Sequence, residues 1–145
     1  MNQAHYNKLR HMYLSANINQ SIFKSTSCTI QEGKATIGLD LSKDYYHALG
    51  TAHGSIYFKL LDDAAFFAAS SLVLDVFILT TSFHINFLRP VSSGQLIAEG
   101  TIKFSSEKLV IAESHLFNDA GKEIAFGVGH FTKSKVPLSK DIGYA

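Results

Sequence analysis

The chain has 145 residues, of which 46% are hydrophobic and 17% are charged, and its formal net charge at pH 7 is +1. This length favours one domain spanning 1–145, and this composition favours a globular protein with a substantial core. The nearly balanced charge, without any basic block, argues against a nucleic-acid partner.

Patterns that direct proteins to membranes or oxidising compartments are not found. Cys28 is the only cysteine, which excludes an intrachain disulfide and a Cys/His zinc pattern. Residues 1–20 lack the continuous apolar core of a signal peptide, and the longest apolar stretch, 64–74, is too short for a membrane span. The seven histidines form no tight cluster with acidic residues. We therefore expect a cytoplasmic protein that has no membrane partner and binds no metal.

The spacing of apolar residues predicts the elements of the first half in chain order. Apolar residues at helical spacing predict an amphipathic helix within 1–20. Alternation of polar and apolar residues over 22–30 and 35–41 predicts a β-hairpin. A loop then leads to a long helix over 55–74, and its nearly uniform apolar character is typical of a helix that is buried by its surroundings.

The second half of the chain alternates between polar and apolar residues and predicts antiparallel strands. The predicted strands are 80–87, 94–104, 109–117 and 124–132. Residues 136–145 are predicted to form a loose tail. One long helix followed by antiparallel strands is typical of the α+β class. A curved antiparallel sheet wrapped around one long central helix is the architecture called the hotdog fold.

The start of the predicted long helix can polarise a carbonyl group. The first N–H groups of a helix lack partners within the helix and carry the positive end of its dipole. Gly54, in the sequence His53-Gly54-Ser55, has no side chain to keep a substrate carbonyl away from those donors. The segment is therefore a candidate oxyanion site, although a glycine before a helix more often forms only a turn.

Two adjacent carboxylates, Asp62 and Asp63, interrupt the apolar helix. Lys59 is four residues before Asp63, and this spacing predicts an ion pair on the helix surface that contributes about 0.3–0.5 kcal/mol to stability. For Asp62, the residues alone support a solvated helix edge and a catalytic carboxylate about equally.

From His47 to Thr132 the sequence resembles the hotdog-fold acyl-CoA thioesterases of the phenylacetic-acid-degradation type. The segment 53–55 is similar to the His-Gly-Gly that opens the family's helix, and 87–90 resembles a strand end of the family. Asp62 falls where the catalytic acid belongs, and Thr80 falls where a hydroxyl belongs. The resemblance implies an acyl-CoA thioesterase that needs no cofactor, because coenzyme A is part of the substrate.

The resemblance also implies roles for individual residues. The N–H of Gly54 would polarise the thioester carbonyl, Asp62 would act as base or nucleophile, and the Thr80 hydroxyl would hold the attacking water. The family's Asn, six residues before its His, is replaced by His47 here. A neutral imidazole can still donate one hydrogen bond, so His47 is a candidate catalytic residue.

Five further residues are candidates for binding the substrate. His53 and Ser55 flank the candidate oxyanion site, and for His53 a structural role at the helix start is favoured over direct chemistry. Arg89, Lys108 and Lys133 are predicted at strand ends, where a surface groove could collect the phosphates of coenzyme A. For each of these three, a solvated surface charge is the simpler interpretation.

Two alternative functions stay open on the same fold. One is a hydroxyacyl-thioester dehydratase that uses His47 and Asp62, and the other is a non-catalytic acyl-CoA-binding protein. Gly54 and Asp62 are eight residues apart on one helix, so their backbones are separated by about 12 Å. Two antiparallel helices around a twofold axis would bring Gly54 of one copy to Asp62 of the other. We therefore expect a homodimer with two shared sites, and a dimer of dimers (a homotetramer).

Overall fold

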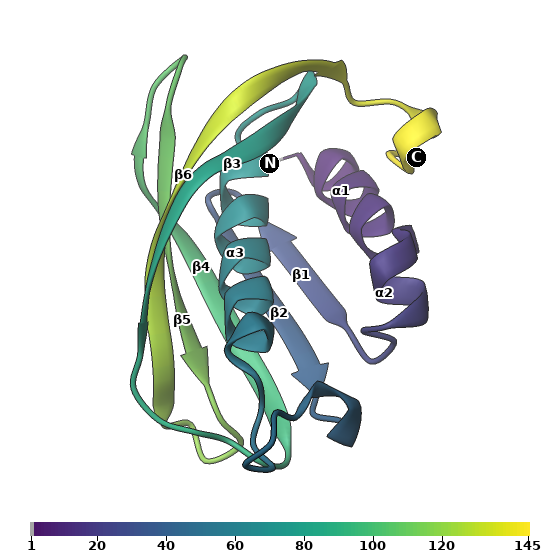
Figure 1. The fold of residues 1–145 in the computed structure, drawn as a ribbon. Helices are drawn as coiled ribbons and strands as arrows, with labels where there is room; N and C mark the ends of the chain where they lie inside the picture. The colour runs from purple at the N-terminus through teal and green to yellow at the C-terminus, as the bar shows by residue number, and fades with distance from the viewer. Residues whose placement is uncertain (1) are drawn as a thin grey trace.

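One curved sheet wraps around one long helix in this computed structural model, which describes residues 2–145 (Figure 1). The sheet has six strands in the order β1-β2-β4-β5-β6-β3, and every neighbouring pair is antiparallel. The strands are β1 (Ser27–Gln31), β2 (Lys34–Asp40), β3 (Val76–Phe87), β4 (Gln95–Ser105), β5 (Val110–Phe117) and β6 (Glu123–Pro137). This architecture confirms the predicted α+β class and the hotdog fold.

The long helix, α3 (Gly54–Ser70), is held against the concave face of the sheet by close contacts. Gly100 of β4 passes so near to α3 that a side chain there would collide with the backbone of Ala64. Ser114 of β5 donates a hydrogen bond of 2.7 Å to the carbonyl of Leu61. These contacts fix the rotation of α3, because both come from the face that is buried against the sheet.

Two N-terminal helices, α1 (Gln3–Ser15) and α2 (Asn17–Ser21), lie beside α3, and α1 is next to the edge strand β1 (Figure 1). The predicted helix within 1–20 is therefore interrupted. Ala16 separates the two helices because its backbone is extended, with a ψ of 142°. Tyr13 of α1 is buried, so the N-terminal segment covers part of the central helix.

Several element boundaries differ from the prediction. β3 begins at Val76 rather than at residue 80, and β6 ends at Pro137 rather than at residue 132. Two further differences have identifiable reasons. The long helix ends at Ser70 rather than at residue 74, because the Ser71 hydroxyl donates to the Ala68 carbonyl and accepts from the Gly33 N–H. The chain can then turn, and β3 begins at Val76. The first strand is also shorter than the predicted 22–30, since a turn precedes it.

The C-terminal residues, predicted to be a loose tail, are packed on the molecule instead. A short 3₁₀ turn, η2 (Lys140–Ile142), follows β6 and lies beside α1 (Figure 1). Ile142 and Tyr144 pack against the core, and the Tyr144 hydroxyl lies 2.8 Å from Nδ1 of His5. The apolar residues of the tail explain the difference, because they bury surface that would otherwise face water. Within residues 2–145, no helix is long and apolar enough to cross a membrane.

Candidate active site

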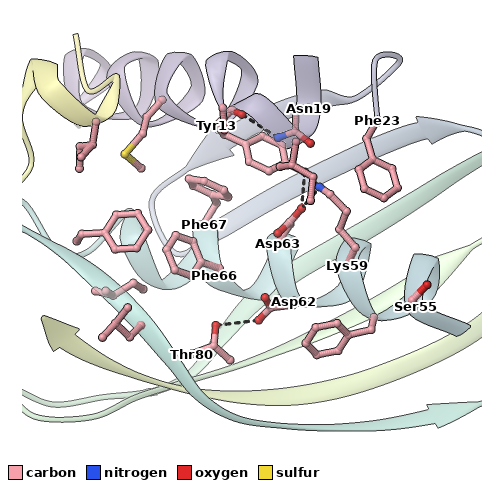
Figure 2. A pocket seen from close by; sticks show the side chains of 18 residues that line it. Tyr13, Asn19, Phe23, Ser55, Lys59, Asp62, Asp63, Phe66, Phe67 and Thr80 are labelled. Carbon is pink, nitrogen blue, oxygen red and sulfur yellow. Dashed lines mark hydrogen bonds and ion pairs between the residues drawn. The ribbon is translucent and has the colours of Figure 1, made fainter. Parts of the chain in front are cut away.

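Asp62 and Thr80 meet on facing elements of the fold. Asp62 is at the middle of α3, and Thr80 is on β3, which passes along the helix. The Thr80 hydroxyl donates a hydrogen bond of 2.9 Å to Oδ1 of Asp62, as Figure 2 shows. The structure therefore brings together two residues that the resemblance places in the candidate site, and it leaves Oδ2 of the carboxylate for another partner.

The surroundings of Asp62 make its carboxylate a stronger base than usual. Burial is the largest cause, and it raises the pKa of Asp62 to about 6 from an ordinary value of 3.8. The Thr80 hydrogen bond opposes the rise, the negative charge of Asp63 adds to it, and Lys59 opposes it. A carboxylate with such a pKa is still ionised near neutral pH, where it can accept a proton from water.

The Asp62 side chain faces an apolar cavity of about 690 Å³. The walls of this larger cavity come from α1, α2, α3, β3 and η2, and aromatic rings such as those of Phe66 and Phe67 make up much of its surface (Figure 2). Ser55 and Lys59 lie along the same face of α3 as Asp62, seven and three residues before it. An apolar volume of this size with a few polar groups is typical of a small-molecule site.

Gly54 lies at a different, smaller cavity of about 330 Å³. The His53 ring caps the helix by accepting the Ser55 N–H at 3.0 Å. The Gly54 N–H, in contrast, has no acceptor among residues 2–145. The space over Gly54 is limited, because an added Cβ would lie 3.3 Å from the Phe87 ring. The helix start therefore offers one free N–H donor at a position that suits glycine.

Comparison with known families agrees with this geometry. The sequence model of the thioesterase superfamily matches residues 49–125, which is more than half of the chain and includes Gly54, Asp62 and Thr80. The chain belongs to the thioesterase superfamily. A search of curated proteins finds no match to the sequence.

Several solved structures share the fold at low sequence identity. The PaaI protein of the Escherichia coli phenylacetic acid degradation operon is 17% identical, with a TM-score of 0.83 over 94% of this chain and 98% of that one. A Haemophilus influenzae thioesterase is 14% identical, with a TM-score of 0.74 over 84% and 85% of the two chains. A Streptococcus mutans protein bound to acetyl-CoA is 16% identical, with a TM-score of 0.71 over 78% and 91%.

His47 lies outside the segment that matches the thioesterase superfamily, and its ring is engaged within its own loop. Its Nδ1 accepts the Leu49 N–H at 3.1 Å, so the neutral ring carries its proton on Nε2. That nitrogen lies 2.9 Å from the Thr51 hydroxyl. His47 lines the smaller cavity with Gly54. Its one N–H can bind a substrate only when its hydrogen bond to the Thr51 hydroxyl is broken.

His53 and Ser55, the two residues beside Gly54, contact each other. Nδ1 of His53 lies 2.8 Å from the Ser55 hydroxyl and also accepts the Ser55 N–H. This cap agrees with the structural role favoured for His53. Ser55 also lines the larger cavity, so the first turn of α3 contacts both cavities.

Within one subunit, the three predicted phosphate-binding residues do not converge on one groove. Arg89 follows β3 at the end of the sheet where α3 begins, and it lines the smaller cavity. Lys133 pairs with Ile78, near the opposite end of β3, which places it roughly 35 Å from Arg89 along the chain direction of β3. Lys108 is in the β4–β5 turn, at the same end as Lys133. Within one subunit, Arg89 alone lies beside the candidate oxyanion donor, because strand direction separates it from the two lysines.

The predicted pair of Lys59 and Asp63 is present, but it is not on the surface. Lys59 Nζ lies 2.6 Å from Oδ2 of Asp63, and the two side chains are only 12% and 19% exposed. The Tyr13 hydroxyl of α1 donates to the same oxygen at 2.6 Å (Figure 2). Sequence reasoning missed this contact, since helical spacing predicts a partner four residues away but not a residue on another helix.

Because the pair is covered by α1, Asp63→Asn should destabilise the protein by about 3 kcal/mol rather than by the few tenths expected for an exposed pair. The mutation leaves the Lys59 ammonium partly buried without its partner. Chemical unfolding in urea measures the difference. Tyr13→Phe is the matched control that removes one hydrogen bond and keeps the ion pair, and it should cost about 1.5–3 kcal/mol. A cost below about 0.5 kcal/mol for Asp63→Asn would show that the pair acts as a solvated one.

Proposed function

We propose that this protein hydrolyses acyl-CoA thioesters. The observation that carries the proposal is the hydrogen-bonded pair of Asp62 and Thr80, which opens into an apolar cavity in a chain of the thioesterase superfamily. A carboxylate with a raised pKa can activate water, and the apolar cavity can accept an acyl group. The acetyl-CoA bound to the Streptococcus mutans neighbour supports a coenzyme A thioester as the substrate.

The reaction uses the groups that the two cavities provide. The N–H of Gly54 binds the thioester oxygen, and a water molecule is held between Asp62 and the Thr80 hydroxyl. Asp62 takes a proton from this water as its oxygen attacks the carbonyl carbon, and negative charge develops on the oxygen at Gly54. The carbon–sulfur bond then breaks, and the departing sulfur takes the proton from Asp62. Coenzyme A therefore leaves as the thiol, and the acyl group leaves as the free acid. A second route, in which Asp62 attacks the carbon and water hydrolyses the resulting anhydride, uses the same residues.

These groups act together only if two copies of the chain associate. Gly54 and Asp62 line different cavities in one subunit, and their backbones are about 12 Å apart along α3. β3 forms one edge of the sheet, and the exposed apolar residues Leu79 and Phe87 lie on it. An exposed apolar edge strand is suited to pair with another strand. We therefore propose a twofold dimer that joins along β3 and brings Gly54 of one copy to Asp62 of the other.

The test of the activity is a thiol-release assay with short, medium, long and aromatic acyl-CoAs. Turnover of at least one class supports hydrolysis. Binding of acyl-CoA without turnover of any class would contradict it and would favour the non-catalytic acyl-CoA-binding alternative. The dehydratase alternative requires a histidine that is free to exchange protons, whereas both ring nitrogens of His47 are occupied in its loop.

The pH dependence of hydrolysis should follow the ionisation of Asp62. The carboxylate is the active form, so kcat/KM should fall as the pH decreases through about 6, the raised pKa of this residue. Thr80→Val removes a hydrogen bond that stabilises the carboxylate, and it should move this acid limb to higher pH. Because histidine side chains also titrate near neutral pH, His47→Asn is the control. It should leave the decrease of kcat/KM at low pH unchanged. If kcat/KM instead decreases with a midpoint near pH 4, Asp62 is excluded as the titrating base.

Arg89 should contribute to the binding of the coenzyme A phosphates. Arg89→Met should raise KM by up to about fivefold, the effect of one exposed charge pair, and should weaken the dependence of KM on salt. Lys34→Met is the matched control: it removes the same charge from an exposed residue of β2, on the other side of the sheet from β3, and it should change neither quantity. Equal effects of the two substitutions would show that only the overall charge of the protein matters.

A further inference from the structure

The end of the larger cavity beyond Asp62 is formed by the two ends of the chain. Met12 of α1 and Ile142 of η2 both line this cavity. The two segments are in contact, because a Cβ at Gly143 would lie 3.3 Å from the Met12 Cα. The segment after β6 also reaches the start of β3, where the Leu138 N–H donates to the Asp75 carbonyl. Ile142 therefore belongs to the part of the fold near the start of β3 and the end of α3.

The cavity has a limited length between the candidate catalytic pair and this end. Phe77 is three residues before Thr80 on β3, a distance of about 10 Å along the strand. Phe66 is one turn beyond Asp62 on α3, a distance of about 6 Å. An extended chain advances by roughly 1.2 Å per bond. The positions of Phe66 and Phe77 therefore lie about five to eight extended carbon atoms beyond Asp62 and Thr80, toward the end of α3 and the start of β3, which is the part of the fold where Ile142 also lies.

Hydrogen bonds hold both closing segments in place. His5 is buried, and its Nε2 donates to the Ser70 carbonyl at 3.0 Å, so its Nδ1 accepts from the Tyr144 hydroxyl at 2.8 Å. The ring of His11 donates to the Gly143 carbonyl at 2.8 Å. The bonds to Gly143 and Tyr144 hold the two residues that follow Ile142. A side chain held in this way acts as a fixed end wall rather than as a mobile lid.

We propose that Ile142, supported by Met12, sets the maximum length of the acyl group. The proposal rests on the proposed thioesterase function, and it assigns medium-length apolar acyl groups as the substrate class of that site. A larger side chain at residue 142 shortens the cavity, and a smaller one lengthens it.

The test compares hexanoyl-CoA with decanoyl-CoA in the full-length protein. In an apolar pocket one methylene group changes discrimination by roughly 10- to 200-fold. The ratio of kcat/KM for decanoyl-CoA to that for hexanoyl-CoA should therefore rise at least tenfold in Ile142→Ala and fall at least tenfold in Ile142→Phe. Asp141→Ala, which changes the exposed neighbour in the same turn, is the matched control and should leave the ratio within about twofold. Tyr144→Phe loosens the turn without changing Ile142, and it should weaken the discrimination against decanoyl-CoA.

A binding experiment separates this proposal from the thioesterase function. Dissociation constants for the same two acyl-CoAs are measured by calorimetry in the Asp62→Asn background, and the Ile142 substitutions should shift their ratio in the same directions. If the protein releases no thiol from any acyl-CoA, the thioesterase function fails, and these constants alone decide the role of Ile142. Ratios that stay within twofold in both Ile142→Ala and Ile142→Phe would overturn the proposal.

Discussion

Asp62→Asn should lower kcat for acyl-CoA hydrolysis by about 10²–10⁴-fold, the usual contribution of a positioned general base. The amide retains the shape of the side chain and can still accept the Thr80 hydrogen bond, so the site keeps its geometry and loses the base. Steady-state thiol release on the best acyl-CoA measures the effect. The neighbouring Asp63→Asn is the matched control, because it removes an equal charge one residue away. Once its lower stability is allowed for, its kcat should stay close to that of the wild type.

The same substitution should make the protein more stable at neutral pH. The folded protein holds Asp62 at a pKa of about 6, above its ordinary value of 3.8, so the folded state binds a proton more tightly than the unfolded state. Stability therefore falls as the pH rises between these two values, by up to about 3 kcal/mol. Asp62→Asn removes this penalty. Its melting temperature should exceed that of the wild type at pH 8, and the difference should vanish below about pH 4.

A second control distinguishes loss of the base from damage to the site. Thr80→Val keeps the carboxylate and removes only the hydroxyl, so its kcat should fall less than that of Asp62→Asn. If Asp62→Asn keeps most of the wild-type activity while Asp63→Asn loses it, the catalytic carboxylate is Asp63.

The sequence and the family resemblance were sufficient to predict the fold and to place Asp62 and Thr80 in one candidate site, whereas the hydrogen bond between them was not predicted. The apolar patterns of α3 and of the strands depend only on neighbouring residues in the sequence, so they predict these elements. The resemblance placed Asp62 on the helix and Thr80 on the next strand, and the fold brings these two elements side by side. The end of α3 was harder to predict, because Ser71 stops the helix through a bond to the distant Gly33.

Features that depend on contacts between distant segments could not be predicted from local patterns. The spacing of Lys59 and Asp63 predicted their ion pair, but nothing in that spacing indicates that Tyr13 of another helix covers it. The tail was predicted to be loose, whereas the Tyr144 hydroxyl bonds to His5, 139 residues earlier in the chain. Strand direction likewise separates Arg89 from Lys133, although both were predicted at strand ends.

The shared site explains why the buried helix carries its catalytic acid two turns from its own oxyanion donor. Gly54 and Asp62 must both come within about 3 Å of one reacting carbonyl group. Their separation of about 12 Å along α3 prevents this within one subunit. In the proposed dimer, each site takes Gly54 from one copy and Asp62 from the other. Loss of either residue therefore inactivates the site, although the other residue is still intact.

Complementation between two inactive variants tests this arrangement most directly. Gly54→Val pushes a side chain toward the Phe87 ring and blocks the donor, and Asp62→Asn removes the base, so each variant alone should be inactive. In a mixed dimer, one site carries both defects and the other carries neither. Co-refolding equal amounts of the two variants should therefore restore about a quarter of the wild-type activity, and purified mixed dimers should show about half. Mixed dimers that form but release no thiol would contradict the shared site.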